Sequence, residues 1–551
     1  MEGGDTIITQ PVCQEDEMRD GEMREVQVGG HPVLLVRDRL QFRALGHKCP
    51  HAGGPLSKGY MVHGRVRCPW HGACFSTHTG DIEEYPTLDC LRTFKVLIND
   101  GKVYVSAKMK DLESSHRVAP MSQRNPLNSQ TVLILGAGPA ALTCAETLRQ
   151  QGFTGRVLMV TRENALPYDR TKLSKEMEAT AESITLRPQS FLDEYNLEIW
   201  KQKEVVSVDT VGKTAQFSDG TCQDYSSLLI ATGSSPRQLQ CPGANLQNVC
   251  TLLTPEDAEK ILQLATGKKV LIVGASFIGM EVAASLSDKA ASIQVVERAE
   301  CPYHGALGDQ VGGVAMKMLQ AQKVHFHMKT EVVELHGEAG KVTQAILSDG
   351  QTIPADVVVL GIGVTPNSGF LQGTAIAMDR SGAILVDRFM QTNVASVFAA
   401  GDVASFPVAL LGGKHASIAH WQVAQAHGHV AAMNILQQKT ELSTVPFFWT
   451  RLRKESIRYA GCGVGYTETV LKGDLSQKKF LIFYIKDGWV TAVASLHFDP
   501  MVAVVAEILY SGRRISKQEA EEMPGKMPQG TGVAPTCPGG MPPPCPTEIK
   551  Q

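Results

Sequence analysis

Two segments of the chain share a pattern in which an apolar strand is followed by a glycine-rich turn and a helix. The first, TVLILGAGPAALTCAETLRQQG, begins at Thr131, and the second, KVLIVGASFIGMEVAASLSDKAASIQVVE, begins at Lys269. This pattern opens a parallel α/β unit, and its glycines let a pyrophosphate approach the positive N-terminus of the helix. Two such openings, about one domain length apart, predict two doubly wound α/β nucleotide-binding domains.

Length and composition agree with a chain of several folded units. At about 150 residues per domain, 551 residues predict about three to four domains. Hydrophobic residues make up 43% and charged residues 20%, a balance that can bury several cores and that excludes a disordered protein.

Charge and hydropathy narrow the partners and the location. The chain has 53 basic and 56 acidic residues, a formal net charge of -3, so no basic excess favours nucleic acid as a partner. Because no run of about 18 apolar residues occurs, no transmembrane segment is expected. The N-terminus MEGGDTIITQ has neither an apolar signal core nor an Arg-rich amphipathic helix, which favours a cytoplasmic location.

Cysteine and histidine alternate within the N-terminal segment, which is rich in short β-type runs. Cys49 and His51 are followed, after sixteen intervening residues, by Cys68 and His71. Two thiolates and two imidazoles on two loops can hold a 2Fe-2S cluster, with the cysteines on one iron and the histidines on the other. A structural zinc site is the alternative. Zinc fingers, however, place their cysteine pair and histidine pair on separate arms, whereas each arm here carries one of each.

The two loops, CPHAGGPL and CPWHGACF, resemble the cluster loops of Rieske iron-sulfur domains. The resemblance implies a Rieske 2Fe-2S cluster whose metal ligands are Cys49, His51, Cys68 and His71. High-potential respiratory Rieske proteins carry an additional cysteine in each loop, and this chain has Gly54 at that place in the first loop. Cys74 then lacks a partner and is expected to be a small buried residue, so the resemblance favours the ferredoxin-like Rieske type.

The first glycine-rich turn has the features of a flavin site. Gly136, Gly138 and Ala141 fill the G-x-G-x-x-G/A pattern, and Glu163, near the end of the next strand, is the candidate ribose-binding acid. Further along, LLIATGSSPR and TNVASVFAAGDVA resemble two motifs of flavoproteins, in which the terminal aspartate, here Asp402, binds the ribityl chain of FAD. Three matches in the right order make FAD the expected cofactor.

The second glycine-rich turn predicts a nicotinamide dinucleotide site. Gly274 and Gly279 lie in GASFIG, where Ser276 stands at the middle glycine position and is expected to narrow the approach to the pyrophosphate. Glu297 ends the following strand, where a carboxylate accepts from a ribose 2′-hydroxyl and repels a 2′-phosphate, so NADH is favoured over NADPH. Gly363, in LGIGVTP, resembles the segment that borders the nicotinamide channel, and a glycine-rich turn after a strand explains it equally well.

The segment PYDRTKLSK, which ends at Lys175, resembles the PYxRxxLSK signature of the ferredoxin-NAD(P)H reductases that serve oxygenases, a group that includes apoptosis-inducing factor. By that resemblance Arg170 and Lys175 approach FAD. Lys175 and Glu281 then form the catalytic pair near the reactive edge of the flavin. The alternative is a surface Arg and Lys at a helix start. The resemblance also places Trp421 and Trp449 against the flavin, and a place in the core is the alternative for both.

Nearly the whole chain, about residues 7 to 515, resembles the Rieske-containing apoptosis-inducing-factor-like proteins. The resemblance implies a multidomain fold: an N-terminal all-β Rieske domain, the two α/β domains, and a small α+β C-terminal reductase domain. The predicted boundaries are 7–110 for the Rieske domain, 111–129 for a linker, 130–250 and 369–445 for the FAD domain, 251–368 for the NAD domain, 446–515 for the reductase domain and 516–551 for a Pro/Gly-rich tail.

The expected function follows from the three cofactors. NADH delivers two electrons as hydride, an iron-sulfur cluster accepts one at a time, and FAD can do both. An NADH-dependent flavoprotein oxidoreductase of the ferredoxin-reductase type is therefore expected, passing electrons through FAD to the Rieske cluster and on to an unknown acceptor, a protein included. The alternative is a redox-responsive signalling protein, linked to cell death by family association, with negligible turnover. The resemblance also allows a mitochondrial location, and the oligomeric state stays open.

Overall fold

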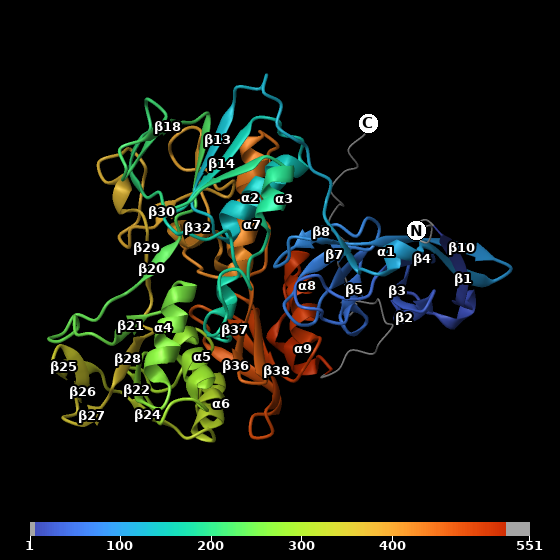
Figure 1. The fold of residues 1–551 in the computed structure, drawn as a ribbon. Helices are drawn as coiled ribbons and strands as arrows, with labels where there is room; N and C mark the ends of the chain where they lie inside the picture. The colour runs from blue at the N-terminus through green and yellow to red at the C-terminus, as the bar shows by residue number, and fades with distance from the viewer. Residues whose placement is uncertain (1–5, 525–551) are drawn as a thin grey trace.

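The structure is a computed structural model that describes residues 6–524, and it has four parts along the chain (Figure 1). Two α/β parts lie one above the other in Figure 1, and the C-terminal sheet lies between the lower α/β part and the N-terminal β-rich part. Among the residues described, no helix combines the length and the apolar character needed to span a membrane.

Two antiparallel sheets form the N-terminal part. The strands of the larger sheet are, in spatial order, β1 (Ile7–Gln14), β11 (Lys102–Lys108), β10 (Thr93–Asn99), β4 (Gln41–Gly46), β3 (His31–Asp38) and β2 (Met23–Val28). The smaller sheet consists of β5 (Tyr60–Val62), β6 (Arg65–Arg67), β7 (Cys74–Ser76) and β8 (Ile82–Glu84). Asp100 and Gly101 join β10 to β11 with φ angles of 47° and 72°, so the hairpin typical of an Asn-Asp-Gly turn is present.

The predicted linker, 111–129, begins with residues that pack on this N-terminal part. Helix α1 (Met109–Leu112) buries Leu112 in the core of the larger sheet. Strand β12 (His116–Arg117) pairs with β9 (Cys90–Leu91). Because the segment is polar and a two-residue strand has no periodic pattern, the sequence alone does not reveal this attachment.

Each of the two α/β parts contains a five-stranded parallel sheet, as the two glycine-rich openings predict. The first sheet has the order β15 (Leu197–Trp200), β14 (Arg156–Val160), β13 (Thr131–Leu135), β19 (Ser227–Ile230) and β31 (Val397–Ala399). Its helices are α2 (Pro139–Gln150), α3 (Gln189–Glu194) and α7 (Trp421–Ile435). The second sheet has the order β21 (Val249–Thr251), β28 (Val357–Leu360), β22 (Lys269–Val273), β23 (Ser292–Glu297) and β24 (Val324–Met328). Its helices are α4 (Pro255–Ala265), α5 (Phe277–Leu286) and α6 (Gly308–Gln320).

The second α/β part is inserted into the first, because β31 completes the first sheet only after the chain has built the second. Short antiparallel strands accompany the parallel sheets. They are β16 (Val205–Asp209), β17 (Thr214–Phe217), β18 (Cys222–Asp224), β20 (Ser234–Pro236), β25 (Val332–Glu338), β26 (Lys341–Leu347), β27 (Thr352–Pro354), β29 (Val364–Pro366), β32 (Ala404–Val408) and β33 (Lys414–Ala416), with β30 (Ile384–Leu385) parallel to β32.

The C-terminal part is an antiparallel sheet with two helices. Its strands have the order β34 (Phe447–Leu452), β35 (Glu455–Gly461), β38 (Trp489–Leu496), β37 (Lys479–Lys486) and β36 (Glu468–Asp474). Its helices are α8 (Met501–Tyr510) and α9 (Lys517–Glu522).

Helix α9 lies in the segment predicted as a Pro/Gly-rich tail, 516–551. A capping box between Ser516 and Glu519 starts the helix, and Ala520 is fully buried in the core that also contains residues of α8. The Ser-x-x-Glu spacing is a signal by which sequence could have revealed this helix. Residues 525–551 of the predicted tail lie outside the described residues.

Candidate active site and metal centre

Two tight loops carry the predicted metal ligands. The first follows β4, where the N–H of Cys49 donates to the carbonyl of Gly54 at 2.9 Å. The second joins β6 to β7, where the N–H of Cys68 donates to the carbonyl of Ala73 at 2.8 Å. A Cβ atom at Gly54 would lie 2.9 Å from the sulfur of Cys68, so a side chain at this position would crowd that sulfur.

The four predicted ligands meet as two pairs of like residues. Cys49 and Cys68 are 3% and 1% exposed, and the hydrogen bond between their side chains raises the pKa of Cys49 and lowers that of Cys68. The Nδ1 atoms of His51 and His71 face each other at 2.9 Å. Burial lowers the pKa of His51 to about 4, so its ring is neutral and can ligate a metal.

This donor set fits a two-iron cluster. A thiol pair beside an imidazole pair supplies two ligands to each of two irons, the arrangement of a Rieske 2Fe-2S centre. Within the part of the chain that the structure describes, no group of three or more His, Cys, Asp or Glu side chains could together bind one metal ion. Cys74 is fully buried in the strand after the second loop, as expected for a cysteine outside the ligand set.

The cluster loops pack directly on the first two strands of the C-terminal sheet. The ring centroid of Trp449, on β34, lies 4.1 Å from that of His71 and 5.3 Å from that of His51. Arg458, on β35, donates through Nε to the carbonyl of Trp70 at 2.9 Å. Gly72 (φ 79°) lies so close to the C-terminal sheet that a Cβ atom there would be 2.5 Å from the ring of Phe447.

Trp449 contacts the cluster histidines, and its predicted place against the flavin stays a prediction. Successive side chains of a strand point to opposite faces, so Trp449 faces the cluster histidines while Phe448 faces the other way. Phe448 packs on His420 with ring centroids 4.4 Å apart, and His420 lines the cavity described next. Strand β34 thus carries neighbouring aromatic side chains toward the cluster loops and toward a residue of the cavity lining.

A cavity of about 590 Å³ lies at the first glycine-rich turn. Trp421, at the first position of α7, lines it, whereas Trp449 does not. The predicted FAD-binding residues that line this cavity are Gly136, Gly138, Glu163, Arg170, Asp402 and Trp421. Ala141 is fully buried within α2, and Lys175 lies beside the cavity, next to the lining residue Ser174.

Glu163 and Arg170 form a linked pair at one end of this cavity. Arg170 pairs with the carboxylate of Glu163 and donates to the carbonyl of Leu253 at 2.8 Å. The hydroxyl of Tyr168 donates to the other oxygen of Glu163 at 2.7 Å. The carboxylate is thus held in place near the end of β14, where a ribose-binding acid is expected.

Asp402 lines the same cavity behind β31. Burial raises the pKa of its carboxyl, and the hydroxyl of Ser234 donates to it at 2.9 Å. The N–H of the neighbouring Gly401 donates to Nδ1 of His427 at 3.1 Å. Ser234 and His427 position the Asp402 turn and were missed from sequence, although Ser234 directly follows the Ala-Thr-Gly motif.

Lys175 and Glu281, the predicted catalytic pair, meet across the two α/β parts. Lys175 Nζ lies 2.9 Å from Glu281, whose carboxylate also accepts from Ser174. Thr450, on β34, donates to the second oxygen of Glu281 at 2.8 Å. Glu281 is 3% exposed, so a buried carboxylate with every oxygen bonded joins both α/β parts to the C-terminal sheet.

The second glycine-rich turn is held by its own residues. Ser276 caps α5 and donates through Oγ to the carbonyl of Gly361 at 2.7 Å. Its hydroxyl is thus engaged with the residue that follows β28, and the expectation that Ser276 narrows the approach to a pyrophosphate stays a prediction. Gly274 lies at the end of β22 with φ 97°, and Gly279 lies in the first turn of α5.

Glu297 lies at the end of β23, as predicted. It accepts hydrogen bonds from the N–H of Ala275 at 2.8 Å and from the N–H of Ala299 at 3.0 Å, which fixes a carboxylate beside the glycine-rich turn. The adjacent Arg298 is 81% exposed and directed toward Glu331. Gly363 accepts from the N–H of Arg237 through its carbonyl at 2.9 Å in the connection between the two α/β parts.

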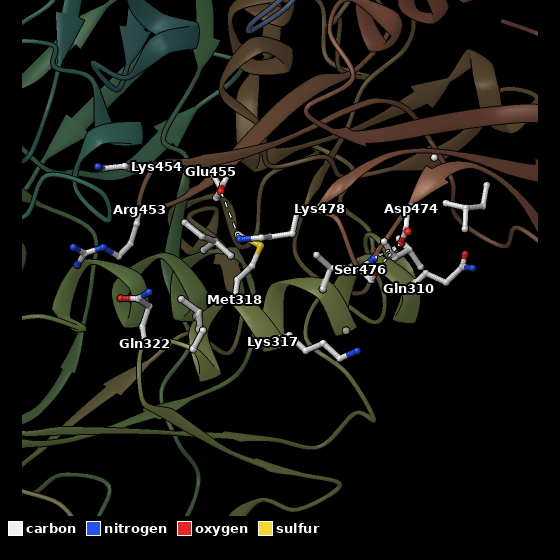
Figure 2. A pocket seen from close by; sticks show the side chains of 18 residues that line it. Gln310, Lys317, Met318, Gln322, Arg453, Lys454, Glu455, Asp474, Ser476 and Lys478 are labelled. Atoms are coloured by element: carbon white, nitrogen blue, oxygen red, sulfur yellow. Dashed lines mark hydrogen bonds and ion pairs between the residues drawn. The ribbon is translucent and has the colours of Figure 1, made fainter. Parts of the chain in front are cut away.

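A larger cavity of about 930 Å³ lies elsewhere, between α6 and the loops that end β34 and β36 (Figure 2). Figure 2 shows Lys478 and Glu455 facing each other there, with their charged atoms 3.9 Å apart. Lys317 and Lys454 extend away from each other at its rim. None of the residues predicted to bind a cofactor or metal lines this cavity.

Three family models match the chain. Residues 8–95 match the Rieske [2Fe-2S] domain, residues 130–428 match pyridine nucleotide-disulphide oxidoreductase, and residues 447–524 match the reductase C-terminal domain.

Curated relatives and solved structures agree with these matches. Apoptosis-inducing factor 3 of Homo sapiens is 48% identical over 93% of this chain and 85% of its own length. Rubredoxin-NAD(+) reductase of Pseudomonas putida is 32% identical over 62% of this chain and 89% of its own length. The structure of the ferredoxin reductase for the CYP199A2 system from Rhodopseudomonas palustris is 27% identical, covers 72% of this chain and 98% of its own, and has a TM-score of 0.68. A chain of the covalent putidaredoxin reductase-putidaredoxin complex is 27% identical, with coverage of 70% and 93% and a TM-score of 0.66.

Proposed function

The chain belongs to the pyridine nucleotide-disulphide oxidoreductase family and carries a Rieske domain before it, and from this we propose that it moves electrons from NADH through FAD to its own 2Fe-2S cluster. It is a flavoprotein oxidoreductase of the ferredoxin-reductase type. Its relatives include proteins named as reductases of ferredoxin and of rubredoxin. We therefore propose a protein electron carrier as the final acceptor.

The observation that supports this route is the place of the cluster loops beside the flavin cavity. Strand β34 connects the two sites, because Trp449 packs on His71 and the preceding Phe448 packs on His420. Asp169, which raises the pKa of His51, and Lys172, which lowers it, flank Arg170 and so bring the flavin-site segment near the first cluster loop. The predicted ligands of the cluster and the predicted flavin site thus share one boundary.

The residues around the flavin cavity bind and orient. When bound, FAD supplies the exchange between a two-electron hydride donor and a one-electron acceptor. Glu163, held by Arg170, would bind a ribose, and Asp402 would bind the ribityl chain. Lys175 keeps a positive charge beside the cavity, and Glu281 balances that charge without reaching the solvent.

The preference for NADH rests on Glu297. Its carboxylate is fixed by two backbone N–H groups, so it cannot move away from a nucleotide bound at the glycine-rich turn. A fixed negative charge accepts a hydrogen bond from a ribose hydroxyl and repels the 2′-phosphate of NADPH.

An anaerobic titration with NADH tests the route, with flavin absorbance and the electron paramagnetic resonance of the reduced cluster followed together. Reduction of both centres supports the proposal. Bleaching of the flavin while an intact cluster stays oxidised would refute it. Steady-state turnover with a one-electron acceptor then separates the enzyme from a signalling protein, which would form a long-lived reduced complex and turn over negligibly.

A further inference from the structure

A buried network of charges joins the Rieske domain to the reductase domain. Arg67, on β6, is 1% exposed and lies 2.6 Å from Glu84 and 2.7 Å from Glu507. Arg65, on the same strand, donates to the other oxygen of Glu507 at 2.7 Å and pairs with Glu83. Of these five residues, only Glu507 belongs to the reductase domain, where it lies on α8.

This network reaches the cluster through the backbone. Arg67 directly precedes the ligand Cys68, and its NH1 donates to the carbonyl of Gly72 at 2.9 Å. Gly72 directly follows the ligand His71. The guanidinium of Arg67 therefore binds both the second cluster loop and a carboxylate of the reductase domain. The position of the loop thus depends on the position of α8.

Apolar packing surrounds the charges on the same face. Tyr60 and Val62, on β5 of the Rieske domain, belong to the same buried cluster as Phe447, Val505 and Leu509 of the reductase domain. Figure 1 shows α8 lying against the strands of the smaller Rieske sheet. The Rieske domain is therefore held by a continuous core and not by isolated surface contacts.

Glu507 adds ion pairs between the two domains to those within the Rieske domain. Inside the Rieske domain, Arg65 and Arg67 have Glu83 and Glu84 as partners, and each arginine gains one oxygen of Glu507 on docking. Tyr510, also on α8, places its ring 4.1 Å from the guanidinium of Arg65. Loss of the Glu507 charge inside the docked structure would leave two buried guanidinium groups without this shared partner, which is strongly unfavourable.

We propose that Glu507 is a positioning residue: through Arg65 and Arg67 it keeps the Rieske domain docked during turnover, so that the cluster is reduced in place. This inference rests on the proposed electron route from FAD to the cluster. It excludes a mechanism in which the Rieske domain moves between a flavin and a distant acceptor.

The test uses the full chain with Glu507→Gln, which keeps the shape of the side chain and removes its charge. Glu468→Gln is the matched control, because Glu468 pairs with Lys517 on the surface of the same domain and is 43% exposed. Iron, sulfide and FAD contents are measured first, so that both variants are compared as loaded protein.

Stopped-flow absorbance and rapid-freeze paramagnetic resonance then follow NADH oxidation under anaerobic conditions. In Glu507→Gln we expect flavin reduction within about twofold of the unaltered protein and cluster reduction slowed about tenfold or more, since small misplacements of reacting groups cost that much. Hydrogen exchange should rise at residues 68–73 and 447–458. The Glu468→Gln protein should match the unaltered chain in all three measurements.

Arg65→Gln removes the charge of the Rieske residue that pairs with Glu507. It leaves Arg67, next to the ligand Cys68, unchanged. If Glu507 acts through the arginines, the double variant is no slower than the more affected single variant. If Glu507→Gln loses its cluster, the rate of cluster reduction is measured in Arg65→Gln instead. Cluster reduction at the unaltered rate in both single variants would overturn the inference. If the unaltered protein does not reduce its cluster, the proposed electron route fails. The docking role of Glu507 is then judged by hydrogen exchange alone, and unchanged exchange in Glu507→Gln would overturn it.

Discussion

The indole of Trp449 packs on the imidazole of His71 with ring centroids 4.1 Å apart and ring planes inclined by 41°. Trp449 belongs to the reductase domain and His71 to the second cluster loop, so this tilted ring contact joins two domains at a predicted metal ligand. Phe448, the preceding residue of β34, packs on His420, which lines the flavin cavity, so the strand lies between the two predicted redox sites.

Trp449→Ala should leave the iron content and flavin reduction by NADH unchanged while slowing cluster reduction about tenfold, because His71 and His51 lose their common packing surface. Trp449→Phe keeps an aromatic face and should restore most of the rate. Single-turnover absorbance measures both steps. Equal rates of cluster reduction in the alanine variant and the unaltered chain would contradict this prediction.

Cys68→Ala should remove the cluster and retain the flavin. Chemical analysis should give about two irons and two sulfides per chain before the substitution and almost none after it. Cys74→Ala is the control, because Cys74 is a buried thiol outside the two pairs and its loss should leave the iron in place. Stoichiometric zinc without sulfide in the unaltered protein would refute the cluster assignment.

Ser276→Ala should cost about 1 kcal/mol of unfolding free energy through the lost helix cap, with the KM for NADH changed less than about twofold. The hydroxyl donates to Gly361 and not toward a nucleotide. Denaturant unfolding and steady-state kinetics provide the two readouts. Thr254→Ala, which removes the cap of α4, should lose similar stability. A large fall in KM on removal of the Ser276 hydroxyl would show that it does narrow the nucleotide site.

Glu297→Gln should raise the ratio of kcat/KM for NADPH to that for NADH about tenfold, because a charged acceptor contributes about 1.5–3 kcal/mol to its hydrogen bonds. Glu331→Gln is the control: it removes the acid that pairs with Arg298 without touching the glycine-rich turn. The measurement is the kinetics of flavin reduction with each nucleotide. An unchanged ratio would place the discrimination at another residue.

Lys175→Met should destabilise the protein by about 3–5 kcal/mol, because it leaves the carboxylate of Glu281 buried without its cation. The two side chains are 11% and 4% exposed, so solvent does little to screen the pair. Adding Glu281→Gln to Lys175→Met should recover part of the loss. Lys289→Met breaks an exposed pair with Glu178 and should cost less than about 1 kcal/mol. Denaturant unfolding measures all four proteins, and equal losses for the two lysine variants would contradict the prediction.

Local patterns in the sequence predicted the features that depend on local geometry. The glycine-rich turns and the two arms that each carry one cysteine and one histidine follow from residues close together in the chain. The pair of Lys175 and Glu281 came from a family resemblance, because no spacing rule links residues that lie 106 positions apart.

Contacts between segments far apart in the chain could not be predicted from local sequence patterns. Arg67 and Glu507 are separated by 440 residues, and their contact depends on how four parts pack together. A single glutamate in the apolar helix sequence MVAVVAEILY was the available signal, since a charge there needs a buried partner. The contact of Trp449 with His71 is of the same kind, because a Rieske loop and β34 meet only in the folded chain.

Tyr60 and Val62 of the Rieske domain share a buried core with Phe447 of the reductase domain. Each of these two domains therefore covers apolar surface of the other. A truncated protein without its first 117 residues would expose Phe447 and the carboxylate of Glu507 together, which favours aggregation over an independent reductase. The N-terminal β-rich part and the C-terminal sheet thus pack as one structural unit. Exchange of its Rieske segment for one from another protein would have to carry over matching changes in α8.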